Sequence, residues 1–467
     1  MLLDWYKGGL CMKENRWEGQ NPLGTEPIGK LILKYSVPTA LTLMVNYFYN
    51  IVDQIFIGQG VGVIGMAATN VSMPFITISS AVALLIGDGC AANISLNLGR
   101  KQQQKADDTI SHSITMLIIA GVVLSVIYSI FVPWIIVLFG ATKHAYASAL
   151  AYARIIIWGL PFLMLSIALT AIIRADGNPK YTMKCMIAGA VINLILDPIF
   201  IFRLHMGVVG AGIATILGQI VAGLLCLNYL RLLQTVHIRK EALKPTRRLS
   251  VEIIKLGISS FITQIMGAAV QIVMNNLMTI YGGQSIYGSE LSLSVYGMIM
   301  KVYQIAHSMF VGISSATQPI NGYNYGAKNY SRVRQTYKTS IVIALFISAS
   351  WFLVYQFFPR QIGMLFVSND FAYLNCCQHF FKIYTMTFFI YGIHMATVSF
   401  FQGIGRPGKA LSIPVFRQGI CFIPLSILLS ARFGLDGALA AVPIADLSAS
   451  VLSLILAKRE FAQTLKG

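Results

Sequence analysis

The sequence contains twelve apolar segments, each long enough to cross a lipid bilayer as an α-helix. About 20 residues suffice for one crossing, because a helix rises about 1.5 Å per residue and the hydrocarbon core is about 30 Å thick. Charged residues make up only 11% of the 467 residues, too few for the surface of a soluble domain. The predicted spans are 31–58, 63–97, 109–139, 148–174, 181–203, 207–231, 253–281, 290–322, 338–358, 373–402, 409–431 and 436–457. The fold class is therefore predicted to be an all-α integral membrane protein with twelve transmembrane helices.

Lysine and arginine are distributed unequally between the two sides. Most of the 35 lie in the N-terminal segment, in the connectors after spans 2, 4, 6, 8 and 10, and at the C-terminus. The opposite connectors hold only Lys143, Arg203, Arg360 and Arg432. Cytoplasmic loops are enriched in these residues, so both termini are predicted to be cytoplasmic. The same distribution explains the net charge of +18 without a nucleic-acid partner.

A long charged connector divides the spans into two sets of six. The predicted units are a cytoplasmic N-terminal extension at 1–30, an N-lobe at 31–231, a cytoplasmic inter-lobe connector at 232–252, a C-lobe at 253–457 and a cytoplasmic tail at 458–467. The first unit lacks the apolar core of a secretory signal peptide, so we expect it to remain on the protein.

The two sets of six spans resemble each other. Lys101 and Lys328 lie 227 positions apart, as do Gly207 and Gly434. Repeated matches at nearly one offset indicate an internal duplication. Two copies with an even number of spans share one orientation, which predicts pseudo-symmetric lobes related by an axis along the membrane normal. Such an arrangement suits alternating access, and a static bundle is the competing interpretation.

Acidic residues inside the spans are few, and each needs a reason. A charge at the bilayer centre costs about 2.5 to 3.5 kcal/mol on insertion scales. The predicted spans contain only Asp53, Asp88, Asp197 and Asp446. Asp53 shares a helix face with Asn46 and Asn50 at spacings of i, i+4 and i+7. This polar face is typical of a binding site in span 1.

A second acidic residue, in span 5, extends the same argument. Asn193 and Asp197 are spaced i, i+4 and share a face. Carboxylate and amide oxygens are ligands for a small cation such as Na⁺, and a desolvated carboxyl group can carry a proton. At the 227-residue offset, Asp53 and Asp197 correspond to Ile280 and Pro424. The sequence therefore predicts a site for Na⁺ or H⁺ at Asp53, Asn193 and Asp197, in the N-lobe alone.

Neutral polar residues mark the corresponding part of the C-lobe. Gln264, Gln271 and Asn275 share a face of span 7. Amides can bind a ligand but cannot release a proton, so these residues are candidates for shaping a substrate cavity. Interhelical hydrogen bonding is the equally weighted alternative for Gln264 and Gln271. The full set of cavity candidates is Asn46, Asn50, Gln264, Gln271, Asn275 and Met278.

Two other acidic residues have different expectations. Asp88 lies between two glycines, and a functional role and close helix packing are equally compatible with it. Asp446 and Arg417 fall at similar depth in spans 12 and 11, which predicts an interhelical ion pair. Lys301 is the competing partner for Asp446.

Several motifs together resemble the multidrug and toxic compound extrusion (MATE) family, in particular its bacterial and archaeal DinF-like branch. Their order and spacing carry the resemblance from about residue 31 to 457. The matching stretches are 37–53, Asn97-Leu98-Gly99-Arg100, 174–179, Asn193-Leu194-Ile195-Leu196-Asp197-Pro198, 207–211 and 319–327. The resemblance implies twelve helices in two lobes and export of drug-like compounds in exchange for Na⁺ or H⁺ across a prokaryotic plasma membrane.

The resemblance also implies roles for particular residues. The family's N-lobe cation site falls on Asp53, Asn193 and Asp197, with Thr215 and the backbone carbonyl of Ala211 as further ligands. Pro38 falls at the bending point of the first helix. Another branch of the family uses acidic residues in spans 7 and 10, and neither predicted span contains one here. Coupling through a C-lobe carboxylate is therefore not expected.

These features predict a secondary active antiporter that exports amphipathic, cationic drugs or toxic organic compounds. We expect a monomer in contact with membrane lipid, with no cofactor beyond the coupling ion and no catalytic centre. The alternative is a flippase for lipid-linked precursors in the same superfamily, but only Lys301 and Arg417 could bind its pyrophosphate inside the membrane. A membrane enzyme is disfavoured because the seven histidines are scattered and form no HExxH motif.

Overall fold

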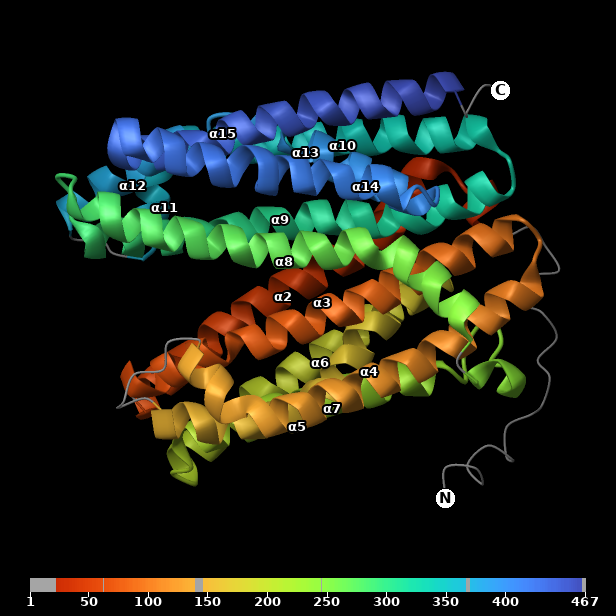
Figure 1. Cartoon of the computed structure of the whole chain (residues 1–467), viewed down its shortest axis with the longest axis horizontal. Helices are drawn as coiled ribbons and strands as arrows, with labels where there is room; N and C mark the ends of the chain where they lie inside the picture. Colours follow the sequence, from red (N-terminus) through yellow and green to blue (C-terminus); the bar gives the residue numbers. More distant parts are fainter. Residues whose placement is uncertain (1–21, 62, 139–145, 245, 367–369, 464–467) are drawn as a thin grey trace.

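The computed structural model describes residues 22–61, 63–138, 146–244, 246–366 and 370–463. The predicted tail and N-terminal extension therefore lie partly outside the described residues. The chain forms two helical bundles that lie side by side (Figure 1). The helices of the first bundle, the N-lobe, are α2 (Ile28–Val61), α3 (Val63–Gly99), α4 (Gln103–Leu138), α5 (Tyr146–Ala175), α6 (Pro179–Pro198) with the π-helical turn η2 (Ile199–Arg203), and α7 (Gly207–Tyr229).

The second bundle, the C-lobe, is built from helices that are more often interrupted. Its elements are α8 (Arg247–Gly283), α9 (Ser289–Gly326), α10 (Tyr330–Phe357), α11 (Pro359–Met364), α12 (Phe371–Tyr384), η4 (Phe388–Ile390), α13 (Tyr391–Gly403), α14 (Pro407–Pro414), the π-helical η5 (Val415–Phe422) and α15 (Ile423–Gln463). Two short elements precede and follow the N-lobe helices in the sequence, α1 (Pro22–Thr25) and η3 (Lys240–Leu243). Helix α2 begins and α15 ends at the same end of the molecule, which we call the inner end (Figure 1).

Twelve membrane crossings account for these helices. In the described part of the chain, nine helices are long and apolar enough to cross a membrane, and α12 with α13, bent by 46°, makes a tenth. Helix α9, with 38 residues, is long enough for another crossing. The run from Pro407 to Gln463 contains two crossings, because Gly434 (φ 61°, ψ −136°) turns the chain within α15. The predicted fold class, all-α with twelve transmembrane helices in two lobes, is confirmed.

The internal duplication is visible in the backbone. Three pairs of residues that match near an offset of 227 have positive φ in both lobes: Lys101 (57°) and Lys328 (59°), Gly177 (101°) and Gly405 (71°), and Gly207 (58°) and Gly434 (61°). A positive φ interrupts a helix and costs a residue with a side chain more than glycine. The same interruptions between helical segments therefore recur at equivalent positions of the two lobes.

Hydropathy misplaced some helix boundaries. The tenth span, expected as one helix over 373–402, is broken between α12 and α13. Gln356 of α10 donates a hydrogen bond to the Lys382 carbonyl (3.2 Å) and another to Thr385 Oγ1 (3.2 Å). A membrane helix can break where a neighbouring side chain satisfies its freed carbonyl groups. Helix α8 begins at Arg247 instead of residue 253. Its first turns contain charged residues, so a hydropathy pattern does not include them in the span although they are helical.

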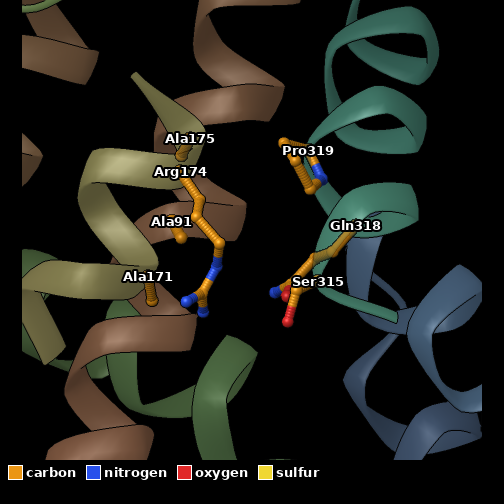
Figure 2. A pocket seen from close by; sticks show the side chains of 7 residues that line it. All are labelled: Ala91, Ala171, Arg174, Ala175, Ser315, Gln318 and Pro319. Carbon is orange, nitrogen blue, oxygen red and sulfur yellow. The ribbon is translucent and has the colours of Figure 1, made fainter. Parts of the chain in front are cut away.

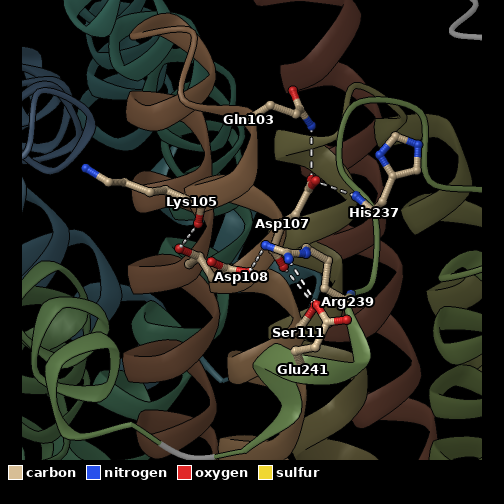
Figure 3. Close-up of polar contacts among 9 residues, drawn as sticks. Gln103, Lys105, Asp107, Asp108, Ser111, His237, Arg239 and Glu241 are labelled. Atoms are coloured by element: carbon tan, nitrogen blue, oxygen red, sulfur yellow. Dashed lines mark hydrogen bonds and ion pairs between the residues drawn. The ribbon is translucent and has the colours of Figure 1, made fainter.

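The inter-lobe connector docks on the N-lobe at the inner end. His237 donates its backbone N–H to Asp107 Oδ1 of α4 (2.9 Å). Arg239 pairs with Asp108 Oδ1 (3.0 Å) and donates its backbone N–H to Ser111 Oγ (2.8 Å) (Figure 3). These contacts hold the connector against α4 before the chain enters α8.

Candidate cation site and inter-lobe cavity

Asp53 of α2 and Asp197 of α6 lie beside each other inside the N-lobe. Their carboxyl groups are within hydrogen-bonding reach of one another. The two side chains are 8% and 0% exposed. Helices α2 and α6 pack together, so residues distant in the sequence share one buried position.

Polar groups of α6 and α7 complete this position. Thr215 Oγ1 donates to the Ala211 carbonyl (2.9 Å). In the amide orientation that satisfies both neighbours, Asn193 donates to Asp197 Oδ2 (3.2 Å) and accepts from the Thr215 backbone N–H (3.1 Å). The structure therefore brings Asn193, Thr215 and the Ala211 carbonyl close to the aspartate pair. The five residues that the sequence and the family resemblance assigned to cation binding are thus linked by a chain of contacts, from Asp53 through Asp197, Asn193 and Thr215 to the Ala211 carbonyl.

Sequence reasoning missed several polar side chains near this point. Gln54 Nε2 donates to Asp53 Oδ2 (3.4 Å) and also contacts Thr69 of α3. Tyr152 of α5 hydrogen-bonds with Thr215 and lies near both carboxyl groups, as does Tyr49 of α2. The i, i+4 spacing of Tyr49 and Asp53 was available as a signal. Tyr152 gave no such signal in the sequence, because an aromatic residue in an apolar helix usually packs against its neighbours.

The aspartate pair has no basic partner in the part of the chain that the structure describes. No ion pair among the described residues includes Asp53 or Asp197. Asp53 Oδ1 is buried and accepts no hydrogen bond from the described residues. Two adjacent carboxylates repel strongly away from water. The pair can be stable only if it holds a proton or a small cation, and its oxygen atoms are of the kind that Na⁺ prefers.

Helix α2 has a weak point on the inner side of this site. Pro38 is buried within the helix and cannot donate a backbone hydrogen bond. Thr42 Oγ1 donates to the Pro38 carbonyl (2.7 Å), and Asn50 Nδ2 donates to the Asn46 carbonyl (2.7 Å). Polar side chains thus bind backbone groups on both sides of the helix centre, which favours local bending.

The polar face of α8 changes surroundings along its length. At the inner end this face packs against α3, where the Leu85 carbonyl occupies the space that a side chain on Gly257 would need. Further outward it carries Gln264, which is half-buried, and then Gln271 and Asn275, which are exposed and linked by a hydrogen bond (3.2 Å). On α2, Asn46 is half-buried and Asn50 is exposed. The amide candidates thus lie on half-buried or exposed faces of α2 and α8, and their role in lining a substrate cavity stays a prediction.

Met278 does not belong to this set. Its side chain is fully buried in the C-lobe core with Met274 and Leu277. The prediction that Met278 faces a cavity was wrong. The connection from α8 to α9 is short, so the outer turns of α8 pack against α9 instead.

The buried charges of the C-lobe are paired. Arg417 Nε donates to Asp446 Oδ1 at 2.6 Å, and the two side chains are 16% and 3% exposed. The Arg417 guanidinium also lies 5.4 Å from the centre of the Tyr391 ring. Lys301, the competing partner, is exposed and forms no ion pair with the described residues. The charge of Arg417 is therefore already compensated and leaves little attraction for a pyrophosphate.

Comparison with other proteins agrees with this arrangement. A family model described as MatE matches residues 38–199 and 261–428, one stretch in each lobe. The multidrug export protein MepA of Staphylococcus haemolyticus is 28% identical over 430 residues, covering 92% of this chain and 93% of that protein. MepA of Staphylococcus aureus MRSA252 is 25% identical over 432 residues, with the same coverage.

Solved structures share the fold. A MOP superfamily transporter from Pyrococcus furiosus superposes with a TM-score of 0.88 at 24% identity, covering 96% of this chain and 98% of that one. A MATE structure in the bent conformation gives a TM-score of 0.86 at 24% identity, over 93% of this chain and 96% of that one. Because the family model covers most of the chain and both lobes, this protein belongs to the MatE family: it is a multi-pass membrane transporter of the multidrug and toxic compound extrusion type and not an enzyme.

Proposed function

We propose that the protein is a secondary active antiporter that exports amphipathic, cationic organic compounds in exchange for Na⁺ or H⁺. Membership of the MatE family supports a transport function, and relatives named as multidrug export proteins support a broad range of drugs. The observation that carries the coupling is the buried Asp53–Asp197 pair, which has no basic partner among the described residues. The protein acts as a monomer in the plasma membrane with both termini in the cytoplasm.

Cation binding would change the charge of the pair and so the shape of α2. When the site is empty, the two carboxylates repel, and α2 moves one of them away from the other. When a cation or proton enters, the repulsion is removed and the carboxyl groups approach. Pro38 lies between this site and the inner end, so α2 can bend there without breaking further backbone hydrogen bonds. Bending changes the width of the inter-lobe cavity and releases the drug outward.

The membrane potential can drive this cycle. Moving one positive charge across the membrane is worth about 2.3 kcal/mol per 100 mV. That energy is comparable with the few kcal/mol that separate conformations of a two-state protein. An inward-negative potential therefore favours cation entry from outside and biases the transporter toward drug release.

The cavity walls suit varied ligands better than one particular ligand. The α8 face offers Gln264, Gln271 and Asn275, neutral groups that can hydrogen-bond without fixing one charge. Nineteen methionines and 26 phenylalanines supply flexible and flat apolar surfaces to the protein as a whole. Such side chains can repack around different molecules. The negative Asp53–Asp197 pair favours substrates that carry a positive charge.

Efflux from proteoliposomes tests this function. Purified protein is reconstituted with an entrapped fluorescent organic cation, and an inward Na⁺ gradient and an inward H⁺ gradient are imposed separately. One of the two gradients is expected to accelerate dye efflux several-fold over liposomes without protein. Efflux that ignores both gradients would contradict ion coupling, and flipping of a labelled polyprenyl pyrophosphate in the same liposomes would favour the flippase alternative.

A further inference from the structure

The lobes touch most closely where the backbone of α3 meets α8 and α9. A Cβ atom added to Gly89 would collide with the Ile253 carbonyl of α8, and one added to Gly99 would collide with the Tyr323 carbonyl of α9. From the other lobe, a Cβ atom added to Gly326 of α9 would collide with the Leu96 carbonyl of α3. Glycine at these positions brings the helix backbones into direct contact. The inner half of the molecule is thus closed by one continuous seam between the lobes.

A carboxylate of the N-lobe lies in this seam and takes its hydrogen bonds from the C-lobe. Ser260 of α8 donates to Asp88 Oδ2 at 2.6 Å. Gln402 of α13 donates to Ser260 Oγ (3.1 Å) and so holds that hydroxyl in place. Gln318 of α9 donates to the Asp88 carbonyl (3.4 Å). Two helices of the C-lobe, α8 and α9, therefore hydrogen-bond to Asp88, and a third, α13, binds the Ser260 hydroxyl.

A basic residue of the N-lobe lies near this carboxylate. The positive charge of Arg174, on α5, attracts the Asp88 carboxylate. The Arg174 side chain extends toward Ser315 and Gln318 of α9 (Figure 2). Between them lies a cavity of about 10 Å³, lined also by Ala91, Ala171, Ala175 and Pro319. This volume is about that of one water molecule. The junction is closed to drug-sized ligands and retains polar groups from both lobes.

The residues of this junction come from equivalent positions of the two lobes. Asp88 corresponds to Ser315 at an offset of 227, and Arg174 corresponds to Gln402 at an offset of 228. Each lobe thus contributes the same two positions, but the N-lobe places charged residues there and the C-lobe places neutral ones. Helix packing alone needs only the neutral pair, since a buried charge costs free energy inside a membrane. The charge in the N-lobe therefore calls for a separate role.

We propose that the Asp88–Ser260 hydrogen bond is the latch that holds the inner end closed and that it breaks when the lobes separate on that side. The proposal rests on the transport function proposed above, because only a transporter that alternates between two openings needs such a latch. Asp88 is a positioning residue: it acts through the seam and does not touch the drug. Ser260 lies one turn before Gln264 on the α8 face, so breaking the latch would expose the same polar face toward the inner side.

Distance measurements between spin labels at the inner end test the latch. Labels replace Gln104 of α4 and Gln335 of α10, which are exposed on opposite lobes, in a protein whose native cysteines are replaced. Ser260→Ala removes the donor and Asp88→Ala removes the acceptor. Each change is expected to raise the population with the longer inner distance about tenfold, which is the effect of one lost hydrogen bond to a charged group. The double variant should show no further increase.

Controls separate the latch from general damage to the helices. Thr263→Ala is the matched control on α8, because Thr263 Oγ1 donates only to the Ser259 carbonyl of its own helix. It should leave the distances unchanged. If Asp88→Ala does not yield folded protein, the distances measured in Ser260→Ala are sufficient to test the proposal. Parent-like distances in Ser260→Ala, or an equal increase in Thr263→Ala, would overturn the proposal. The distance measurement needs neither ion nor drug. A protein that does not exchange drug for an ion would therefore still give a clear answer about the Asp88–Ser260 hydrogen bond.

Discussion

Asp53 and Asp446 are both buried aspartates of membrane helices, but their surroundings give them different roles. Asp446 receives a hydrogen bond from Arg417 at 2.6 Å, so its charge is compensated permanently. Asp53 lies beside Asp197 and has no basic partner among the described residues, so we propose that a proton or cation that can leave compensates its charge. A permanent partner favours a structural role, and a missing partner favours the binding of an ion.

Removing Arg417 should destabilise the C-lobe. Arg417→Met leaves Asp446 buried without a partner, which costs about 3–5 kcal/mol of unfolding free energy. The double variant Arg417→Met with Asp446→Leu should recover much of this loss, because no isolated charge remains. Thermal unfolding of the purified variants in detergent measures both effects, with Arg432→Met, an exposed arginine, as the control. An unchanged melting temperature in the single variant would show that the pair contributes little.

Spacing within one helix predicted the candidate residues that share a face with an acid, but not those that approach from other helices. Asn193 and Asp197 were found because they are one turn apart. Tyr152 was missed because its contribution depends on how α5 packs against the site, whereas Tyr49 and Gln54 lie on α2 with Asp53 and were overlooked there. Met278 was misplaced for the same reason, since its face of α8 is covered by α9 only in the folded protein.

At the level of whole elements, the inter-lobe connector is a part of the N-lobe. Asp176, directly after α5, accepts hydrogen bonds from the Tyr229 hydroxyl (2.8 Å) and from the backbone N–H groups of Gln234 (2.9 Å) and Thr235 (2.7 Å). These bonds fix the start of the connector, as the contacts with α4 fix its middle. The connector therefore moves with the N-lobe, and any hinge between the lobes must lie closer to α8.

Asp176→Ala should release the connector. The substitution leaves four donors without their acceptor, namely the Tyr229 hydroxyl, the Thr235 hydroxyl and the backbone N–H groups of Gln234 and Thr235, so the Arg and Lys residues between α7 and α8 become more accessible. Limited trypsin digestion is expected to cut this variant at the connector about fivefold faster than the parent, consistent with a loss of about 1 kcal/mol of local stability. Asp436→Ala, an exposed site in the C-lobe, should be cut at the parental rate. Equal rates in all three proteins would refute a docked connector.

Helix α2 contains both Asp53 of the candidate cation site and a proline that interrupts its backbone hydrogen bonding. Pro38→Ala restores a backbone N–H and allows a hydrogen bond to the Lys34 carbonyl, which should stiffen the helix; an interior proline costs a helix about 3 kcal/mol. Ion-driven dye efflux is expected to fall at least fivefold while the melting temperature stays the same or rises. Val37→Ala, next to it on the exposed surface, serves as the control. Parental efflux in Pro38→Ala would show that bending at this residue is not needed.

Across the whole molecule, the two lobes share a scaffold but not their chemistry. Helix ends recur at equivalent positions, whereas Asp53 and Asp197 correspond to Ile280 and Pro424. The apolar segments and the duplication predicted the twelve helices and the two lobes. They could not predict the break between α12 and α13 or the seam along α3, because both depend on neighbouring helices that hydropathy does not identify.

The central claim is that the Asp53–Asp197 pair binds and releases the coupling cation in each transport cycle. Organic-cation efflux from proteoliposomes under an imposed ion gradient, compared between the parent and Asp53→Asn, tests it most directly. Asp53→Asn keeps the size of the side chain and removes its charge, so gradient-driven efflux should fall to the level of liposomes without protein, while Asp436→Asn should transport normally. Parental, gradient-driven efflux by folded Asp53→Asn protein would contradict this account.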